Sequence, residues 1–345
     1  MKISSLTEWT DWIKIYNKES VAKFINPRAG ESKLGEHVCF ISHPEELKNH
    51  PAKYVLLGIP EDIGVRANYG KPGTSEAWEA TLGAFLNIQD NHFTNANNLI
   101  LLGEIDCDKQ MVQAHELSQN IDHNVEELGE LVIQIDHKVE RIVETIVAAG
   151  KIAIIIGGGH NNSYGNLSGT SAALGKKINC INMDAHTDFR SLEHRHSGNG
   201  FTYAFARGYL SKYFIFGLHQ NYTSENVLCA IRDTQGRVQF SLFEDIELEK
   251  TKTFTEALQE AEDFCCNDDF GIELDLDSIE GMGSSAMTSS GFSMTKARRF
   301  LRHFSKLPNL RYVHLCEGAP KAGLFPNAVA KGISYLISDV INEKK

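Results

Sequence analysis

Residues 120–160 of the chain read NIDHNVEELGELVIQIDHKVERIVETIVAAGKIAIIIGGGH. Up to Ala149, apolar residues recur at intervals of three and four positions with charged residues between them, which predicts a helix with one buried face. Gly150 is expected to end this helix. The run 152–156 is then uniformly apolar, which is typical of a strand buried on both faces of a sheet. A long helix followed at once by a buried strand indicates an α/β fold.

The same alternation extends along the chain in both directions. Further strands are expected at 54–58, 98–103, 178–183, 213–217, 238–242, 270–277 and 310–316, and further helices near 162–174, 254–266, 294–305 and 327–342. Apolar strands separated by helices build a mainly parallel sheet with helices on both faces. No repeat or linker interrupts the pattern, so we expect a single domain over 51–345. Residues 1–50 are predicted to be an irregular or helical N-terminal extension that packs on this body through Trp9, Trp12 and Ile13.

Composition narrows the class of protein. The net charge is -11, from 34 basic and 45 acidic residues, and the absence of a basic block argues against nucleic-acid binding. No apolar run approaches the roughly 20 residues of a membrane span, and the N-terminus lacks the apolar core of a signal peptide. Seven cysteines without a CxxC pair indicate neither a disulfide framework nor a cysteine zinc site. We therefore expect a cytoplasmic protein that acts on a small molecule.

Three polar segments stand where predicted strands end: GGGH at 157–160, DAHTD at 184–188 and LDLD at 274–277. Each has an ordinary interpretation alone, namely a glycine turn with an incidental histidine, a solvated acidic loop and a strand with an acidic outer face. Ligands of open α/β sheets bind beyond the carboxyl ends of the strands, where all three segments lie. In extended chain, alternate residues project to one side, so the acids and imidazoles of each segment are expected to converge. Six potential metal ligands result: His160, Asp184, His186, Asp188, Asp275 and Asp277.

The ligand types predict the chemistry. Carboxylate oxygens suit manganese or magnesium, and imidazole extends the range to iron and zinc. Six ligands are more than one tetrahedral zinc needs, so two divalent ions bridged by carboxylate and hydroxide fit best. Such a pair lowers the pKa of bound water and supplies a nucleophile at neutral pH. Because GxSxG, Walker A and GxGxxG motifs are absent, metal-assisted hydrolysis is the sharpest hypothesis.

The three segments, in this order, resemble those of the ureohydrolase superfamily of arginases, agmatinases and formimidoylglutamases, from about residue 54 to the C-terminus. The resemblance implies a three-layer α/β/α fold, the six ligands above, two Mn²⁺ ions per chain, and a homo-oligomer, either trimer or hexamer. Two departures stand out. Most relatives have Asp where Gly159 stands, and most have Asp-Pro shortly after the DxD pair, where this chain has Ser278 and Ile279.

Three further segments resemble the formimidoylglutamase branch: DFR at 188–190, HSGNGF at 196–201, and the stretch 58–73. That branch splits N-formimidoyl-L-glutamate into L-glutamate and formamide in histidine degradation. An arginine fork suits this diacid because it binds a carboxylate through two hydrogen bonds. The substrate-binding residues implied are Arg190, Ser197, Asn199, Arg66 and Asn68. The catalytic residues implied are Glu317, which pairs with the amidinium, Asp188, which reorients the bridging hydroxide, and His196, which with Asp188 and solvent is a candidate proton shuttle.

Alternatives remain at this stage. Arg190 is also consistent with a structural salt bridge, Arg66 with loop stabilisation, and His194 and His196 with surface positions in a charged loop. For the whole protein, the alternatives are another ureohydrolase (arginase, agmatinase or guanidino-acid hydrolase), a deacetylase-like amidohydrolase with one zinc, or a catalytically silent metal-binding homologue.

Overall fold

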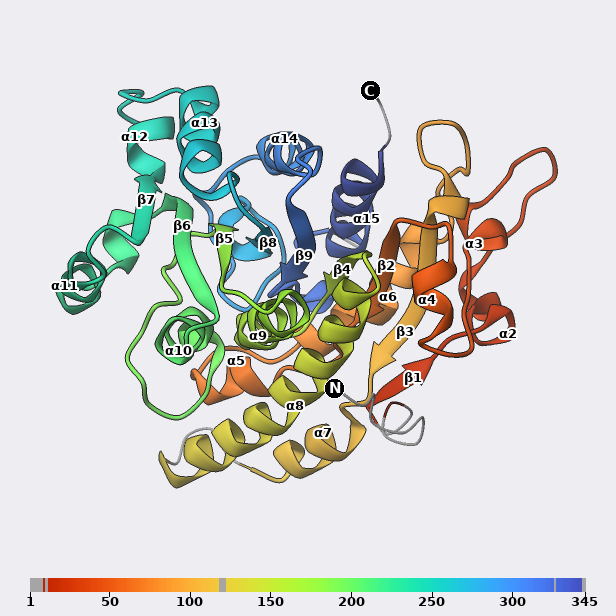
Figure 1. The fold of residues 1–345 in the computed structure, drawn as a ribbon, viewed down its shortest axis with the longest axis horizontal. Helices are drawn as coiled ribbons and strands as arrows, with labels where there is room; N and C mark the ends of the chain where they lie inside the picture. The colour runs from red at the N-terminus through yellow and green to blue at the C-terminus, as the bar shows by residue number, and fades with distance from the viewer. Residues whose placement is uncertain (1–8, 10–11, 118–121, 326, 343–345) are drawn as a thin grey trace.

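The central feature of the molecule is a nine-stranded sheet, seen in a computed structural model that describes residues 9, 12–117, 122–325 and 327–342 (Figure 1). The strand order is β1-β3-β2-β4-β9-β8-β5-β6-β7, and every pairing except β1–β3 is parallel. The strands are β1 Ile13–Ile15, β2 Tyr54–Gly58, β3 Leu99–Ile105, β4 Ile152–Ile156, β5 Ile178–Met183, β6 Leu210–Leu218, β7 Val238–Leu242, β8 Phe270–Asp275 and β9 Leu310–Cys316.

Helices cover both faces of this sheet. The longer ones are α6 Ala77–Phe85, α7 Asp108–His115, α8 Asp122–Ala148, α9 Ser163–Leu174, α10 Gly200–Arg207, α11 Glu225–Asp233, α13 Phe254–Cys265, α14 Met294–Phe304 and α15 Ala328–Ile341. The shorter ones are α2 Lys18–Val21, α3 Leu34–His37, α4 Glu46–Asn49, α5 Ile63–Ala67 and α12 Phe243–Glu247. One apolar cluster joins the sheet to α6, α13, α14 and α15, and a second joins its other face to α8, α9 and α10. The predicted three-layer α/β/α fold is confirmed.

The local sequence explains this layering. All five residues of β4 are buried, and alternate side chains enter opposite clusters, with Ile154 in the first and Ile155 in the second. Along α8, Val132, Ile135 and Val139 are buried in the second cluster, at the three- and four-residue spacing expected of a helix face. Ile121, which the predicted helix included, lies outside the described residues.

The N-terminal segment contributes an edge strand that the sequence analysis did not include. β1 pairs antiparallel with β3, with Ile13 opposite Ile105 and Ile15 opposite Gly103. Gly103 allows this approach, because a Cβ at that position would lie 2.0 Å from the carbonyl oxygen of Lys14. Trp9, in the same segment, is buried. A strand of three residues carries too little alternation to be recognised from sequence.

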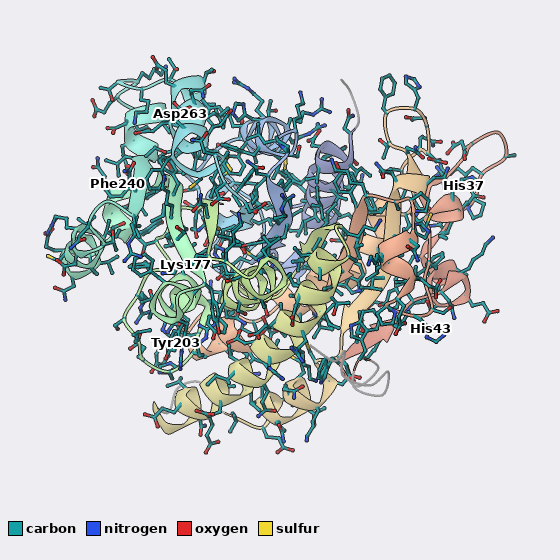
Figure 2. The ribbon with its side chains drawn as sticks, viewed as in Figure 1. His37, His43, Lys177, Tyr203, Phe240 and Asp263 are labelled. Carbon is teal, nitrogen blue, oxygen red and sulfur yellow. The ribbon has the colours of Figure 1, made fainter. Side chains whose placement is uncertain are left out.

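The order of the central strands positions the functional residues. β4, β9, β8 and β5 are neighbours, so the segments that follow their carboxyl ends meet at one edge of the sheet. Figure 2 shows the side chains that fill the space between the layers, with His37 and His43 in the N-terminal region and Asp263 on α13. Among the described residues, none of the helices combines the length and apolar character needed to cross a bilayer.

Candidate metal centre

A glycine turn after β4 presents the first ligand. Gly157 and Gly158 have φ of 87° and 72°, in the left-handed region that favours glycine. A Cβ on Gly158 would lie 2.3 Å from Nδ2 of Asn162, so this turn also needs a residue without a side chain. The turn leads directly into His160, whose side chain is fully buried.

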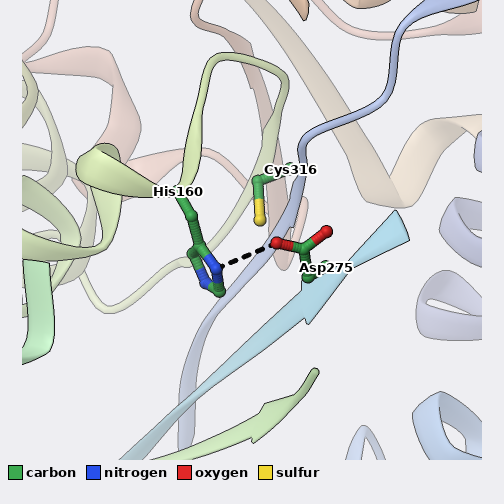
Figure 3. A group of neighbouring side chains, drawn as sticks. All are labelled: His160, Asp275 and Cys316. Atoms are coloured by element: carbon green, nitrogen blue, oxygen red, sulfur yellow. Dashed lines mark ion pairs between the residues drawn. The ribbon is translucent and has the colours of Figure 1, made fainter. Parts of the chain in front are cut away.

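His160 faces three aspartates, of which Asp184 and Asp188 follow β5 and Asp275 ends β8. Its Nδ1 lies 2.7 Å from Oδ2 of Asp188, 3.2 Å from Oδ2 of Asp275 and 3.3 Å from Oδ2 of Asp184. Figure 3 shows the His160 ring directed at Asp275, with the Cys316 sulfur beside them. One ligand atom from each of His160, Asp184, Asp188 and Asp275 lies within 4.8 Å of the others, and we call these four residues the His160 group.

A second set lies next to it. Nδ1 of His186 is 3.1 Å from Oδ2 of Asp277 and 3.5 Å from Oδ1 of Asp184. Asp184, His186 and Asp277 again have ligand atoms within 4.8 Å of one another, and we call them the His186 group. Asp184 directs one oxygen to each group. The structure thus brings all six residues proposed from the sequence into two adjoining groups that share one carboxylate.

The way the ligands converge differs from the expected alternation of extended chain. β5 ends at Met183, and the backbone N of His186 then donates to Oδ1 of Asp184 at 2.7 Å. After β8, the backbone N of Asp277 donates to Oδ1 of Asp275 at 2.8 Å in the same manner. Asp188 adopts a left-handed φ of 44°, which Asp tolerates better than most residues. Two Asx-type turns, rather than strand alternation, therefore gather the acids.

The electrostatics of the two groups favour a bound cation. Burial and the neighbouring carboxylates raise the pKa of Asp275 well above its usual value, and burial with the Asp184 charge raises the pKa of Asp188. Both ring nitrogens of His160 are buried and lack a partner in hydrogen-bonding geometry, although acids lie close by. Concentrated buried carboxylates are costly unless positive charge is present. Four carboxylates and two imidazoles form a donor set that suits divalent manganese, iron or zinc.

A cavity of about 700 Å³ opens over both groups. Eight of the predicted site residues line it: Asn68, His186, Asp188, Arg190, Ser197, Asp275, Asp277 and Glu317. His160 and Asp184 lie beneath this surface, with no exposed side-chain area. The cavity therefore combines metal-type ligands at its base with charged and polar groups along its wall.

Glu317 is an acid of the cavity wall that contacts the backbone of His160. It has a left-handed φ of 61°, its Oε1 accepts from the backbone N of His160 at 2.7 Å, and its Oε2 accepts from the hydroxyl of Ser285. Burial raises the pKa of Glu317 to about 8. A cationic ligand beside it would favour the carboxylate form.

Arg190 stands at a more open part of the cavity and is half-exposed. Its Nη1 donates to Oδ1 of Asn68 at 2.7 Å, and Nδ2 of Asn68 donates to the Ser197 hydroxyl at 3.1 Å. Nη2 of Arg190 lies 3.1 Å from Oε1 of Glu193. The salt bridge considered from the sequence is present, and the same guanidinium also lines the cavity.

Besides His160 and Asp184, three further predicted site residues lie outside the cavity lining. Arg66 turns toward α7, where its Nη2 donates to the carbonyl oxygens of Ala114 and Leu117. Asn199 is buried, and its Oδ1 accepts from the backbone N of His196 and from Arg195. Substrate contact by either residue is not supported, because their polar atoms are engaged in holding loops.

His196 is the third, and its position argues against a proton shuttle. Its side chain is 1% exposed, Nδ1 accepts from the backbone N of Gly198 at 3.0 Å, and Nε2 lies 3.0 Å from Oε1 of Glu193. Burial lowers the pKa of His196 to about 4, despite the attraction of Glu193. Nor is it a surface histidine. His194 is partly buried as well, with Nε2 2.9 Å from the carbonyl oxygen of Ala67.

The structure adds residues that sequence reasoning missed. The Tyr222 ring stacks on His186 with centroids 4.9 Å apart, and Ser285 holds Glu317. Glu273 and His314 lie behind His160, and Glu273 belongs to the same alternating acidic run as Asp275, which was the available signal. Tyr222 and Ser285 lie in loops whose sequence carries no periodic pattern.

Cys316 is a further addition, grouped with His160 and Asp275 in one cluster and with Glu273 and His314 in another. Burial raises the pKa of its thiol well above the usual value. Its Sγ donates to the carbonyl oxygen of Leu274 at 3.6 Å.

Known proteins share this architecture. A formimidoylglutamase of Macrococcus caseolyticus is 26% identical over 268 residues, which are 77% of each chain. The crystal structure of a Trypanosoma cruzi formiminoglutamase with Mn²⁺ superposes with a TM-score of 0.69 at 20% identity, over 90% of this chain and 98% of that chain. A Bacillus subtilis formimidoylglutamase gives a TM-score of 0.71 at 15% identity, over 92% and 93%. At these identities the two structures demonstrate a common fold.

The decisive match is to a family model. The model of the arginase family matches residues 52–333. This span contains Glu317, the His160 group and the His186 group. Because that span is most of the 345 residues, the chain belongs to the arginase family.

Proposed function

We propose that this protein is a binuclear metal hydrolase that splits N-formimidoyl-L-glutamate with water into L-glutamate and formamide. The observation that carries the proposal is that Glu317 and Arg190 line one cavity with the two ligand groups. An acid beside the ligands suits the amidinium end of this substrate, and an arginine farther out suits a carboxylate. The names of the curated relative from Macrococcus caseolyticus and of the Bacillus subtilis structure agree with this choice.

The residues present fit a pair of divalent ions, and we propose Mn²⁺ at both positions. The His160 group would hold one ion and the His186 group the other, with Asp184 shared between them. Two such ions supply a water whose pKa is lowered toward neutrality, which makes a nucleophile at physiological pH. The oxygen-rich donor set and the unpartnered nitrogens of His160 support this assignment.

The chain's own residues orient the substrate and move the proton. Glu317, held from two sides by the His160 backbone and Ser285, accepts hydrogen bonds from the amidinium and fixes its carbon over the ligand groups. Arg190 binds a substrate carboxylate and thereby fixes the position of the substrate along the cavity. The Asp188 carboxylate reaches both the His160 group and the cavity, so it can take a proton from water and pass it to the departing amine. The oxygen of that water forms a bond to the amidine carbon and the bond from this carbon to the amine breaks, so glutamate leaves as the amine and the carbon leaves as formamide with the water oxygen in its carbonyl group.

A product assay on manganese-loaded protein tests the proposal. Formamide from N-formimidoyl-L-glutamate supports it, while urea from arginine, agmatine or a guanidino acid assigns another ureohydrolase activity. Manganese bound without turnover of any substrate marks a silent homologue, and a single zinc ion per chain marks a deacetylase-like site. Metal analysis of the same sample separates the last two outcomes.

A homo-oligomer, trimeric or hexameric, and a cytoplasmic role in histidine degradation are also proposed, from resemblance alone. Light scattering coupled to size exclusion tests the oligomer. A monomer under all conditions would remove that part of the proposal without affecting the assignment of the activity.

A further inference from the structure

A layer of buried polar side chains lies behind His160, on the side away from the cavity. Glu273, His314 and Asn166 are each 0% exposed, and none of them lines the cavity. Oε2 of Glu273 lies 2.5 Å from Nδ1 of His314 and 3.5 Å from Nε2 of His160. Oε1 of Glu273 accepts from Nδ2 of Asn166 at 3.2 Å.

Strand register creates this arrangement. β8 and β9 are parallel neighbours, with Glu273 opposite His314 and Asp275 opposite Cys316 two residues farther along. Because alternate residues share a face, Glu273 and Asp275 point to the same side of β8. The strand that supplies a metal-type ligand therefore also supplies the acid beneath the neighbouring ligand, His160.

The two ring nitrogens of His160 face different acids. Nδ1 faces the carboxylates of the His160 group, 2.7 Å from Asp188, so it is the nitrogen beside any cation that those carboxylates hold. Nε2 lies 3.5 Å from Oε2 of Glu273. Because a carboxylate only accepts hydrogen bonds, Glu273 is placed to accept the Nε2 proton when Nδ1 binds a metal. His314 contacts Glu273 through Nδ1, and its other ring nitrogen, Nε2, lies 3.1 Å from the carbonyl oxygen of Gly157. Gly157 belongs to the turn that presents His160.

We propose that Glu273, braced by His314, is a positioning residue that holds His160 as a ligand through Nδ1. This inference rests on the proposed metal centre. An imidazole binds a metal only through an unprotonated nitrogen, and a partner for the opposite N–H fixes both the tautomer and the ring orientation. Loss of such a partner typically weakens metal binding about 10- to 100-fold. The rival explanation is a buried ion pair that only stabilises the packing of β8 on β9.

Manganese titration of the metal-free full-length chain separates the two explanations, with free Mn²⁺ followed by its electron paramagnetic resonance signal. We expect two binding steps in the parent protein, and a His160→Ala variant identifies the step that belongs to the His160 group. Glu273→Leu removes the acceptor and is expected to weaken that step about 10- to 100-fold, with a much smaller effect on the other. Glu273→Gln keeps an oxygen for the Nε2 proton and is expected to recover part of the loss.

A matched histidine–carboxylate pair provides the control. On the outer helices, Nε2 of His303 lies 2.6 Å from Oε2 of Glu262, and both side chains are partly exposed. Glu262→Gln is expected to leave both manganese steps as in the parent. A merely structural role for Glu273 predicts the same unchanged steps in its own variants, with only a lower melting temperature, and that result would overturn the inference.

A measurement on the parent alone covers the case in which Glu273→Leu does not fold. In zinc-loaded protein with ¹⁵N-labelled histidine, we expect His160 to show a protonated Nε2 and a metal-bound Nδ1. Metal bound through Nε2 would refute the positioning role. If the parent binds no manganese, the proposed metal centre is overturned as well. If the parent binds manganese in two steps and the Glu273 variants bind it with the same affinities, only this inference is overturned.

Discussion

Acid is expected to destabilise this protein through one buried histidine. His196 is held neutral in the fold, because its Nδ1 accepts from the backbone N of Gly198 while its Nε2 faces Glu193. A proton added to Nδ1 would set two donors against each other and place a charge on a side chain that is 1% exposed. Unfolding releases both constraints, so the unfolded chain binds this proton more readily than the folded one.

The size of the effect follows from the pKa. Burial lowers the pKa of His196 from 6.5 to about 4, and each unit corresponds to about 1.4 kcal/mol. The folded pKa lies below the unfolded one, so the contribution is complete above pH 6.5 and is lost as pH falls toward 4. The free energy of unfolding is therefore expected to fall by about 3 kcal/mol across this window from His196 alone.

Urea unfolding of metal-free protein at several pH values gives the free energy of unfolding of the parent and of a His196 variant. The difference between the two proteins measures the contribution of His196. His196→Asn keeps an acceptor for Gly198 but does not titrate, so the stability gap between parent and variant is expected to shrink by about 3 kcal/mol between pH 7 and pH 4. His43→Asn, at an exposed position in the N-terminal region (Figure 2), serves as the control and is expected to follow the parent. A gap between parent and His196→Asn that stays constant with pH would refute the reasoning.

Other changes test the centre and the cavity. Asp277→Ala is expected to abolish activity and lower manganese stoichiometry together, by assay and elemental analysis, because Asp277 faces His186 at 3.1 Å; retention of both would remove it from the centre. Arg190→Ala removes a charge-assisted contact worth about 1.5–3 kcal/mol, so the Michaelis constant for the diacid should rise at least tenfold while manganese affinity stays unchanged; equal loss of both indicates a structural role. Gly159→Asp would place its Cβ 2.6 Å from Oδ1 of Asn161 and 2.8 Å from Val65, so denaturant unfolding should show a loss of about 1–3 kcal/mol. Manganese at a hundred times its dissociation constant should stabilise the fold by about 2.7 kcal/mol per site, and calorimetry that finds no shift on chelation contradicts a bound metal.

The sequence predicted the sheet well because its strands are buried on both faces. In β4 and β5 every residue is buried, so each predicted strand has clear ends in the sequence. Metal-type ligands lie in the segments that follow these ends. The periodicity of α8 is equally clear over its described part. Strand order followed only from the structure, since no local pattern states that β9 inserts between β4 and β8.

Side-chain direction beyond the strand ends was harder to predict. Arg66 was expected in the cavity, yet it is drawn away by two carbonyl groups near α7 that are remote in sequence. Asn199 and His196 are likewise fixed by Arg195, which is itself buried against Asp136 and lies over the ring of Tyr203. Such networks form only in the folded chain, so neither spacing nor resemblance reveals which polar residues face the ligand.

The short strand β1 has a consequence for how this chain tolerates shortening. The family match begins at residue 52, yet the edge of β3 beyond it is covered by Ile13–Ile15 from before that boundary. A version trimmed to the matched region would expose backbone N–H and C=O groups along β3, ready to pair with a second copy. The leading residues thus act as a guard against self-association, independently of any part in the chemistry.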